Sequence, residues 1–177
     1  MAQPRLSDTD FLKWPFFERQ HSELRDAVSS WCDSFEPGES KDDYRIAANC
    51  VKSLGQAGLL RYCVPAADGG ALEKLDVRSL CLVRETLAYS NGLFDFAFAM
   101  QGLGAGPISL FGNSEQRKSY LPQVSQGDKI AAFALSEELA GSDVAALATS
   151  ARLEGDSYIL NGEKTWISNA GLADFYV

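Results

Sequence analysis

The chain has 177 residues, of which 46% are hydrophobic and 23% charged, and its net charge at pH 7 is −8. These values are typical of a globular protein that buries a real core, with one domain and part of another at this length. The lack of a basic stripe excludes a nucleic-acid-binding surface. No apolar run approaches the roughly 20 residues that span a bilayer, and the N-terminus lacks the basic-then-apolar pattern of a signal peptide. The sequence therefore predicts a cytoplasmic protein without membrane contact.

The first part of the chain has the periodicity of α-helices. Apolar residues recur at helical spacing over residues 24–35 and again over residues 46–54, where Gly55 and Gly58 are expected to end the run. The single histidine, His21, lies among charged residues. This setting favours a solvated helix surface over a catalytic pocket.

Three further helices are predicted in the next segment. Asp76 is a good N-cap for the first of them. Residues 94–111 are almost uncharged apart from Asp95, which indicates a helix buried on most of its sides. A short helix is expected to begin at Ser114 and to close at Pro122.

After Gly127 the apolar period shortens to that of strands. Strands are predicted over residues 131–136, 148–154, 157–160, 164–168 and 174–177. Gly155-Asp156 and Asn161-Gly162 fall between three of them, and Asn-Gly favours a hairpin because both residues tolerate positive φ. We therefore predict an α+β chain, with a helical bundle domain over residues 1–129 and the start of an antiparallel, barrel-like β-domain over residues 130–177. Because the last strand would be a bare edge, truncation of a longer protein is the first interpretation.

Cysteines and charges restrict the chemistry further. The cysteines have no C-x-x-C spacing and are interpreted as small core residues, in preference to disulfides or a metal site: Cys32, Cys50, Cys63 and Cys81. Residues 1–129 carry 14 Lys+Arg and 17 Asp+Glu, net −3, and residues 130–177 carry 2 and 7, net −5. An anionic ligand of the second segment would therefore be held by backbone N–H and hydroxyl groups, with any cation supplied from elsewhere.

Two sequence words in the second segment are the most specific features of the chain. Residues 136–143 read S-E-E-L-A-G-S-D, and residues 158–169 read Y-I-L-N-G-E-K-T-W-I-S-N. They resemble the T-E-P-x-x-G-S-D and Y-x-L-N-G-x-K-x-W-I-T-N words of the acyl-CoA dehydrogenases. Further resemblance lies in residues 54–70 and 111–122. The resemblance covers the chain from about Phe17 onward. It implies the family's N-terminal helical domain and the start of its middle β-domain. Family members are about twice as long, and their C-terminal helical domain is absent from these 177 residues.

The resemblance implies contacts to FAD. Ser136 and Ser168 stand where the family has Thr residues that hydrogen-bond the flavin edge, and Trp166 resembles the Trp beside the flavin. Surface serines at strand ends and a half-buried strand aromatic are the alternatives. Gly141 permits close approach of backbone because it lacks a Cβ. The full implied set of cofactor contacts is Phe133, Leu135, Ser136, Gly141, Ser142, Trp166, Ile167 and Ser168.

The acyl-thioester substrate is implied to contact Ser142 and the helix over residues 94–106. Phe94, Phe98 and Leu103 would line the acyl pocket, with a simple core helix as the alternative for each. The family's proton-abstracting Glu belongs to the C-terminal helical domain, so no catalytic residue and no metal ligand is assigned in this chain.

One departure from the family pattern lies inside the first word. Glu138-Leu139 replaces the usual Pro-Gly, which removes two turn-setting residues and adds a carboxylate beside Glu137. The expected consequence is a shifted loop or weaker binding of FAD rather than a different fold.

The sequence therefore predicts part of an FAD-dependent acyl-CoA dehydrogenase of fatty acid or amino acid catabolism. The complete enzyme would oxidise an acyl-CoA to the 2,3-enoyl product, pass electrons to an electron-transfer flavoprotein and form a homo-oligomer. This portion alone is expected to be inactive because the base is missing. The alternatives are a non-catalytic binding module with the same fold, and a related flavin monooxygenase or acyl-carrier-protein dehydrogenase. The sequence specifies neither the length nor the branching of the acyl group.

Overall fold

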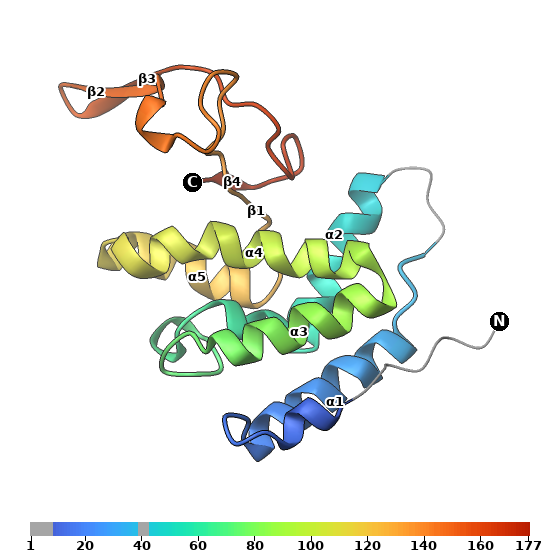
Figure 1. Ribbon diagram of the computed structural model, residues 1–177. Coiled ribbons are helices and arrows are strands. Elements are labelled where there is room, and N and C mark those ends of the chain that lie inside the picture. Colours follow the sequence, from blue (N-terminus) through green and yellow to red (C-terminus); the bar gives the residue numbers. More distant parts are fainter. Residues whose placement is uncertain (1–8, 39–42) are drawn as a thin grey trace.

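The computed structural model describes residues 9–38 and 43–177, and the α-helices precede the strands in this part of the chain (Figure 1). Residues 1–8, which contributed to the prediction that a signal peptide is absent, lie outside the described ranges. The α-helices are α1 (Arg19–Ser34), α2 (Asp43–Gln56), α3 (Val77–Ser90), α4 (Gly92–Phe111) and α5 (Ser114–Ser125). The 3-10 helices are η1 (Asp10–Lys13), η2 (Leu59–Cys63), η3 (Ala66–Asp68) and η4 (Val144–Ala146). The strands are β1 (Ala131–Ala132), β2 (Ser150–Glu154), β3 (Ser157–Asn161) and β4 (Phe175–Tyr176). The predicted order of a helical part followed by the start of a β-part is confirmed.

The apolar helix α4 lies at the centre of the core. It contacts α2, α3, α5 and β1, because its sequence offers apolar side chains on several sides. Phe94 lies edge-on to Trp31 of α1, with 5.1 Å between the ring centroids, and Trp31 in turn stacks on Phe35 at 4.7 Å. The predicted burial of this helix is nevertheless incomplete. One stripe of it faces outward, with exposed side chains at Leu103, Leu110 and Phe111.

The environment of His21 differs from the prediction. Its charged neighbours favour a solvated position, but its side chain is fully buried. The ring accepts a hydrogen bond at Nδ1 from the Glu18 N–H at 2.9 Å, and its Nε2 lies 2.8 Å from Asp76 Oδ2. Asp76 is the N-cap of α3, as predicted, and accepts from the Ser79 N–H at 3.3 Å. The buried imidazole therefore joins the starts of two helices.

Helix α5 is longer than predicted. Asn113 caps it by accepting from the Gln116 N–H at 2.9 Å, so Ser114 is its first residue, as predicted. Pro122 does not close the helix, which continues to Ser125. Proline removes only its own donor, and the Gln126 N–H still reaches the Pro122 carbonyl at 3.2 Å.

The strands form two separate pairs. β1 pairs with β4 in parallel beside α4, and β2 pairs with β3 in an antiparallel hairpin farther from the helices (Figure 1). The hairpin turns at Gly155-Asp156, one of the two predicted turns, with Gly155 at a φ of 60°. The hairpin prediction is confirmed at this position.

Other strand predictions were wrong. Residues 164–168 form no strand, because Trp166 adopts a φ of 57° within a bend. Asn161-Gly162 makes no hairpin, because β3 ends at Asn161. Gly162 has a φ of 151° and lies close to Thr149. A Cβ at Gly162 would come within 2.2 Å of the Thr149 Oγ1. The first and last predicted strands shorten to the two-residue β1 and β4.

Three cysteines are buried as predicted, at Cys32, Cys50 and Cys63, whereas Cys81 is exposed on α3. Burial raises the pKa of Cys50 to about 11 and that of Cys63 to about 12, so both are neutral thiols at pH 7. In the described ranges no cluster of His, Cys, Asp and Glu is arranged to hold a metal ion. None of the helices described is both long and apolar enough to cross a bilayer.

Candidate functional site

A buried glutamine attaches the start of the β-region to α4. Gln101 is fully buried; its Nε2 donates to the Lys129 carbonyl at 2.8 Å, and its Oε1 accepts from the Ala131 N–H at 2.8 Å. One turn further along α4, a Cβ on Gly104 would come within 2.3 Å of the Ala131 Cβ. Phe175 of β4 is buried next to this strand. β1 is thus fixed against the helical core and sets where the following segments begin.

The segments that contain the two sequence words lie side by side. The Thr165 N–H donates to the Ser136 carbonyl at 2.9 Å. Lys164 Nζ donates to the Leu135 carbonyl at 2.9 Å and to Glu137 Oε1 at 2.8 Å, across 27 positions in sequence. Ser136 and residues 166–168 therefore project from adjacent backbones.

The carboxylate of Glu137 is held ionised. Besides the Lys164 ammonium, it accepts from the backbone N–H of Ala148 at 2.7 Å and of Thr149 at 3.0 Å. Lys164 first, and then the donors of Thr149 and Ala148, lower the pKa of Glu137 to about 2, because each favours the charged form. At neutral pH this side chain is a structural anion and not a general base.

The turn at Glu138-Leu139 is formed by backbone hydrogen bonds. The Glu137 N–H donates to the Ala140 carbonyl at 2.9 Å, and the Ala140 N–H donates back to the Glu137 carbonyl at 3.2 Å. The side chain of Leu139 points into solvent, with 92% of it exposed. A tight turn therefore forms here without the Pro-Gly pair of the family word.

The predicted flavin contacts fall into two exposure classes. Half-buried side chains are those of Phe133, Leu135, Ser136, Ile167 and Ser168, and exposed residues are Gly141, Ser142 and Trp166. Trp166 is 93% exposed, so the alternative of a half-buried strand aromatic is wrong. A Cβ on Gly141 would meet no atom within 4 Å, which leaves the backbone there accessible to a ligand.

Two non-glycine residues in the second word have positive φ. Trp166 has a φ of 57° and Asn169 a φ of 63°, a conformation that L-residues seldom adopt. Asn169 Nδ2 donates to the Ala131 carbonyl at 2.9 Å, which ties this turn to β1. Backbone outliers of this kind concentrate at ligand sites, where the surrounding structure holds them in place.

The predicted acyl-pocket residues do not share one surface. Phe94 and Phe98 are buried in the helical core, at 3% and 1% exposure, whereas Leu103 faces outward at 47%. The remaining predicted substrate contact, Ser142, lies in the exposed last part of the first word. The described residues thus bring together the cofactor contacts of the two words but not the substrate set.

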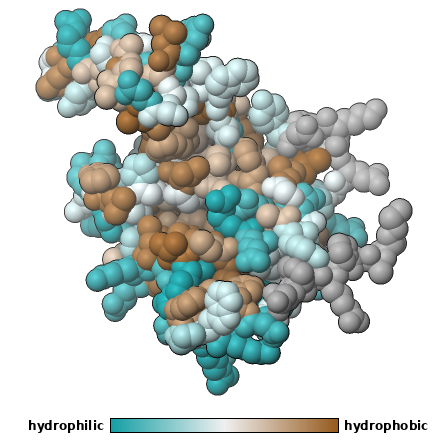
Figure 2. All heavy atoms as spheres, in the orientation of Figure 1, coloured by the Kyte–Doolittle hydropathy of each residue, from teal (hydrophilic) through white to brown (hydrophobic). Residues whose placement is uncertain are grey.

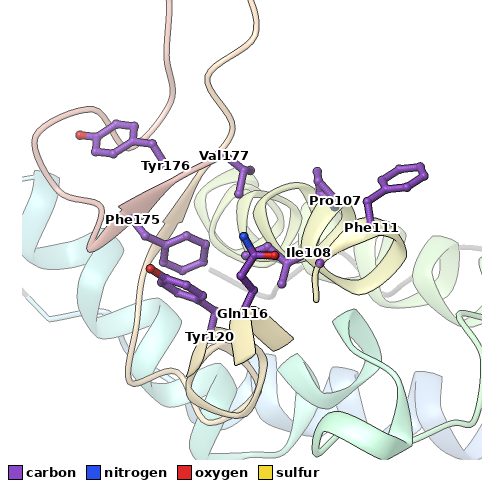
Figure 3. Close-up of a pocket in the computed structure, with 9 residues that line it drawn as sticks. Pro107, Ile108, Phe111, Gln116, Tyr120, Phe175, Tyr176 and Val177 are labelled. Carbon is purple, nitrogen blue, oxygen red and sulfur yellow. The ribbon is translucent and has the colours of Figure 1, made fainter. Parts of the chain in front are cut away.

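A separate cavity of about 360 Å³ lies between α4, α5 and β4 (Figure 3). The ring of Phe175 lies 4.7 Å from that of Tyr120, and Lys129 Nζ lies 5.0 Å from the centre of the Tyr120 ring. The lining residues are Pro107, Ile108, Phe111, Gly112, Gln116, Tyr120, Phe175, Tyr176 and Val177. None of the predicted cofactor or substrate contacts is among them, so this cavity is distinct from the two-word site.

Sequence reasoning missed four residues that organise the site, namely Gln101, Glu137, Lys164 and Asn169. A polar glutamine in an otherwise apolar helix was a usable signal, since buried polar groups have partners. Glu137 and Lys164 each lie inside a sequence word but carry no local sign of pairing. Asn tolerates positive φ, so Asn169 after Ser168 was compatible with a turn.

Two domain models of a single family match most of the chain. The N-terminal domain of acyl-CoA dehydrogenases matches residues 18–128, and the middle domain of acyl-CoA dehydrogenases matches residues 132–177. The chain belongs to the acyl-CoA dehydrogenase family.

Individual relatives agree with this assignment. A probable acyl-CoA dehydrogenase of Bacillus subtilis (strain 168) is 42% identical over 137 residues, which are 76% of this chain and 23% of that protein. The structure of an acyl-CoA dehydrogenase complexed with FAD from Bacillus anthracis gives a TM-score of 0.72 at 33% identity, over 92% of this chain and 28% of that one. A glutaryl-CoA dehydrogenase from Mycobacterium smegmatis in complex with FADH2 gives a TM-score of 0.80 at 28% identity, over 96% and 43%. The chain spans less than half the length of each of these relatives.

Proposed function

We propose that the protein containing this chain is an FAD-dependent acyl-CoA dehydrogenase, and that this chain forms one wall of its cofactor site. The observation that carries the proposal is the hydrogen bond of 2.9 Å from the Thr165 N–H to the Ser136 carbonyl. It sets the two sequence words side by side, so the hydroxyls of Ser136 and Ser168 and the indole of Trp166 come from neighbouring segments.

The groups at this site fit a flavin ring. Hydroxyl and backbone N–H groups are suited to the edge of a neutral heteroaromatic ring, and the exposed Trp166 indole offers a flat apolar face with one N–H donor. The two cations of residues 130–177 are already paired, Lys164 with Glu137 and Arg152 with Glu154. Charge on a pyrophosphate would therefore be met by backbone N–H groups or by cations from another segment.

In the proposed reaction FAD, when bound, accepts two electrons from the acyl thioester. The role of this chain is to hold the ring edge through Ser136 and Ser168 and to cover one face with Trp166. Because the hydrogen bonds from Lys164, Thr149 and Ala148 lower the pKa of Glu137, its carboxylate is a weak base, and we assign it no proton-abstracting role. The catalytic base is assigned to a segment outside this chain, and we expect the chain alone to be inactive.

The remaining parts of the proposal rest on the family resemblance. They are an acyl-CoA substrate, an electron-transfer flavoprotein as electron acceptor, a homo-oligomeric complete enzyme and a cytoplasmic location.

The first experiment is an absorption spectrum of the purified complete polypeptide together with its intact mass. We expect flavin bands, their bleaching by an acyl-CoA in the absence of oxygen, and a 2,3-enoyl-CoA product. The variant Trp166→Ala should weaken FAD binding by about fivefold, since one aromatic stacking contact contributes on the order of 1 kcal/mol. Tyr158→Ala, which removes another exposed aromatic of the β-region, is the matched control. A folded protein that takes up no FAD would overturn the proposal and favour a non-catalytic binding module.

A further inference from the structure

The three segments with predicted flavin contacts converge on one ion pair. Lys164 Nζ lies 2.8 Å from Glu137 Oε1, and both side chains are largely shielded, at 23% and 9% exposure. We propose that Glu137 and Lys164 form a positioning latch that fixes the spacing of these segments. Neither residue is among the predicted flavin contacts. The effect of the latch on FAD binding rests on the proposed function.

Lys164 belongs to the second word, and its side chain is hydrogen-bonded to residues around the start of the first word. Its ammonium donates to the Leu135 carbonyl and to the Glu137 carboxylate, the residues on either side of Ser136. The next residue, Thr165, donates its N–H to the Ser136 carbonyl. Three consecutive residues, Leu135 and the first two of the first word, thus accept hydrogen bonds from two consecutive residues of the second. The position of Ser136 relative to Trp166 is fixed by this set of contacts.

Glu137 extends the latch to the loop that runs from Ala140 to β2. Its carboxylate accepts from the Ala148 and Thr149 N–H groups, which follow η4. Its backbone closes the turn with Ala140 at the other end of the same loop. Gly141 and Ser142 lie between these two attachments, so a single glutamate restrains both ends of the exposed loop.

The two side chains of the pair are shielded from solvent, so their ion pair should contribute more than an ion pair on the surface. An ion pair between exposed side chains contributes little, because water and salt screen it. Here the carboxylate accepts from three donors in a shielded position, and removing either charge leaves the other without its counter-ion where water screens it poorly. The adjacent Glu138 is exposed and provides a control with the same chemistry.

The structural test is hydrogen exchange of single amides. We compare Glu137→Gln and Lys164→Met with the control Glu138→Gln. Loss of the latch should accelerate exchange at the Ala148, Thr149 and Thr165 amides by tenfold or more, while amides of α4 keep the wild-type rate. Unchanged exchange at these three amides in both latch variants would overturn the proposal.

The functional test is FAD titration of the complete native polypeptide with the same variants. We expect about tenfold weaker binding and an altered visible flavin spectrum for both latch variants, and less than twofold change for Glu138→Gln. The conservative variant Lys164→Arg, which keeps a cation and its donors beside Glu137 and the Leu135 carbonyl, should retain more of the affinity than Lys164→Met. Faster exchange with unchanged FAD affinity would overturn the positioning role.

The two tests separate the latch from the proposed function. If the wild type takes up no FAD, the proposed function fails, while the exchange rates still decide whether Glu137 and Lys164 link the three segments. If the wild type binds FAD and the latch variants match Glu138→Gln in both tests, the latch fails and the function stands.

Discussion

The helical region and the β-region of this chain are held together by different kinds of contact. The helices share an apolar core that includes Val28, Leu54 and Phe98, all at 1% exposure or less. In the hairpin every residue of β2 and β3 is exposed, including Tyr158 at 68% and Leu160 at 72%. Apolar side chains are visible on the surface of this region at the top of Figure 2. The β-region depends on polar attachments where the helical region depends on burial.

The division between the two regions does not coincide with the change from helix to strand. Ala131 of β1 and Phe175 of β4 belong to the same apolar cluster as the helices. The hairpin residues do not belong to it. β1 and β4 therefore share the stability of the helices, and the segments between them depend on side chains such as Asn169 and Lys164.

The largest expected contrast between the two regions is in side-chain truncation. Phe98→Ala should lower the free energy of unfolding by about 3–5 kcal/mol, because it leaves a cavity in the core. Tyr158→Ala should change it by less than about 0.5 kcal/mol, because the ring is already in solvent. Urea unfolding followed by far-ultraviolet circular dichroism measures both. Equal losses would show that the hairpin is as well packed as the helices.

The contact between the two regions can be tested at two glycines of α4. Gly104→Ala should destabilise by about 1–3 kcal/mol, since the added methyl group collides with Ala131. Gly106→Ala, half a turn away and with no atom within 4 Å of a Cβ, should be neutral or stabilising by up to about 1 kcal/mol. Thermal unfolding of the two variants provides the comparison. Identical shifts in Tm would contradict the close approach of α4 and β1.

Within the helical region, polar capping should matter less than core packing. Asp76→Ala is expected to cost about 1–2 kcal/mol by removing the N-cap of α3 and the partner of His21. Glu85→Ala, on the exposed side of the same helix, is the control and should stay within about 0.5 kcal/mol.

The same aspartate predicts a pH dependence. Burial raises the pKa of Asp76, but the hydrogen bonds from His21, Arg78 and Ser79 outweigh it and lower the pKa below the ordinary 3.8. Its contribution is therefore complete above that value and is lost as the pH falls further. The stability difference between wild type and Asp76→Ala should shrink as the pH falls below about 4. A difference that keeps its full size down to the lowest pH would contradict the stabilising role of the ionised carboxylate.

The smallest expected effect is the pH response of the latch. The pKa of Glu137 falls from an ordinary 4.5 to about 2, so its stabilising contribution is present above 4.5 and disappears between about 4.5 and 2. Wild type and Glu137→Gln should therefore differ in exchange at the Thr165 amide at pH 6, and should converge toward pH 2. Exchange at the Thr165 amide in Glu138→Gln, which alters an exposed residue, should match the wild type over the whole pH range.

Local patterns were sufficient to predict most of the helices. The apolar period located α1 and α2, the N-cap at Asp76 marked the start of α3, and Ser114 was correctly predicted as the first residue of α5. His21 was misplaced because its partner, Asp76, lies 55 positions away and no local pattern reports such a contact. The end of α5 was predicted too early. A proline in the last turns removes one N–H donor, but its carbonyl still accepts a hydrogen bond, so the helix continues beyond it.

The strands were less predictable, because the extended or bent state of these segments depends on contacts made with other parts of the chain. β1 is held by Gln101 of a helix, and Trp166 departs from extended structure at a positive φ that aromatic propensity does not suggest. The two sequence words located the candidate site through the family resemblance. Their adjacency depends on Lys164 and Glu137, whose charges taken alone are typical of solvated residues, so only the three-dimensional arrangement identifies the latch.

The contacts of Gln101 have a consequence for the order of folding. Ile130 and Asp174 meet across 44 positions, and closing so long a loop costs more entropy than joining neighbouring helices. Gln101 and Ala131 are only 30 positions apart and meet on the helical core. β1 can therefore dock on α4 before β4 arrives, and serves as a template for the last strand. A high φ-value for Gln101→Leu with a φ-value near zero for Phe175→Leu is the kinetic pattern that this order predicts.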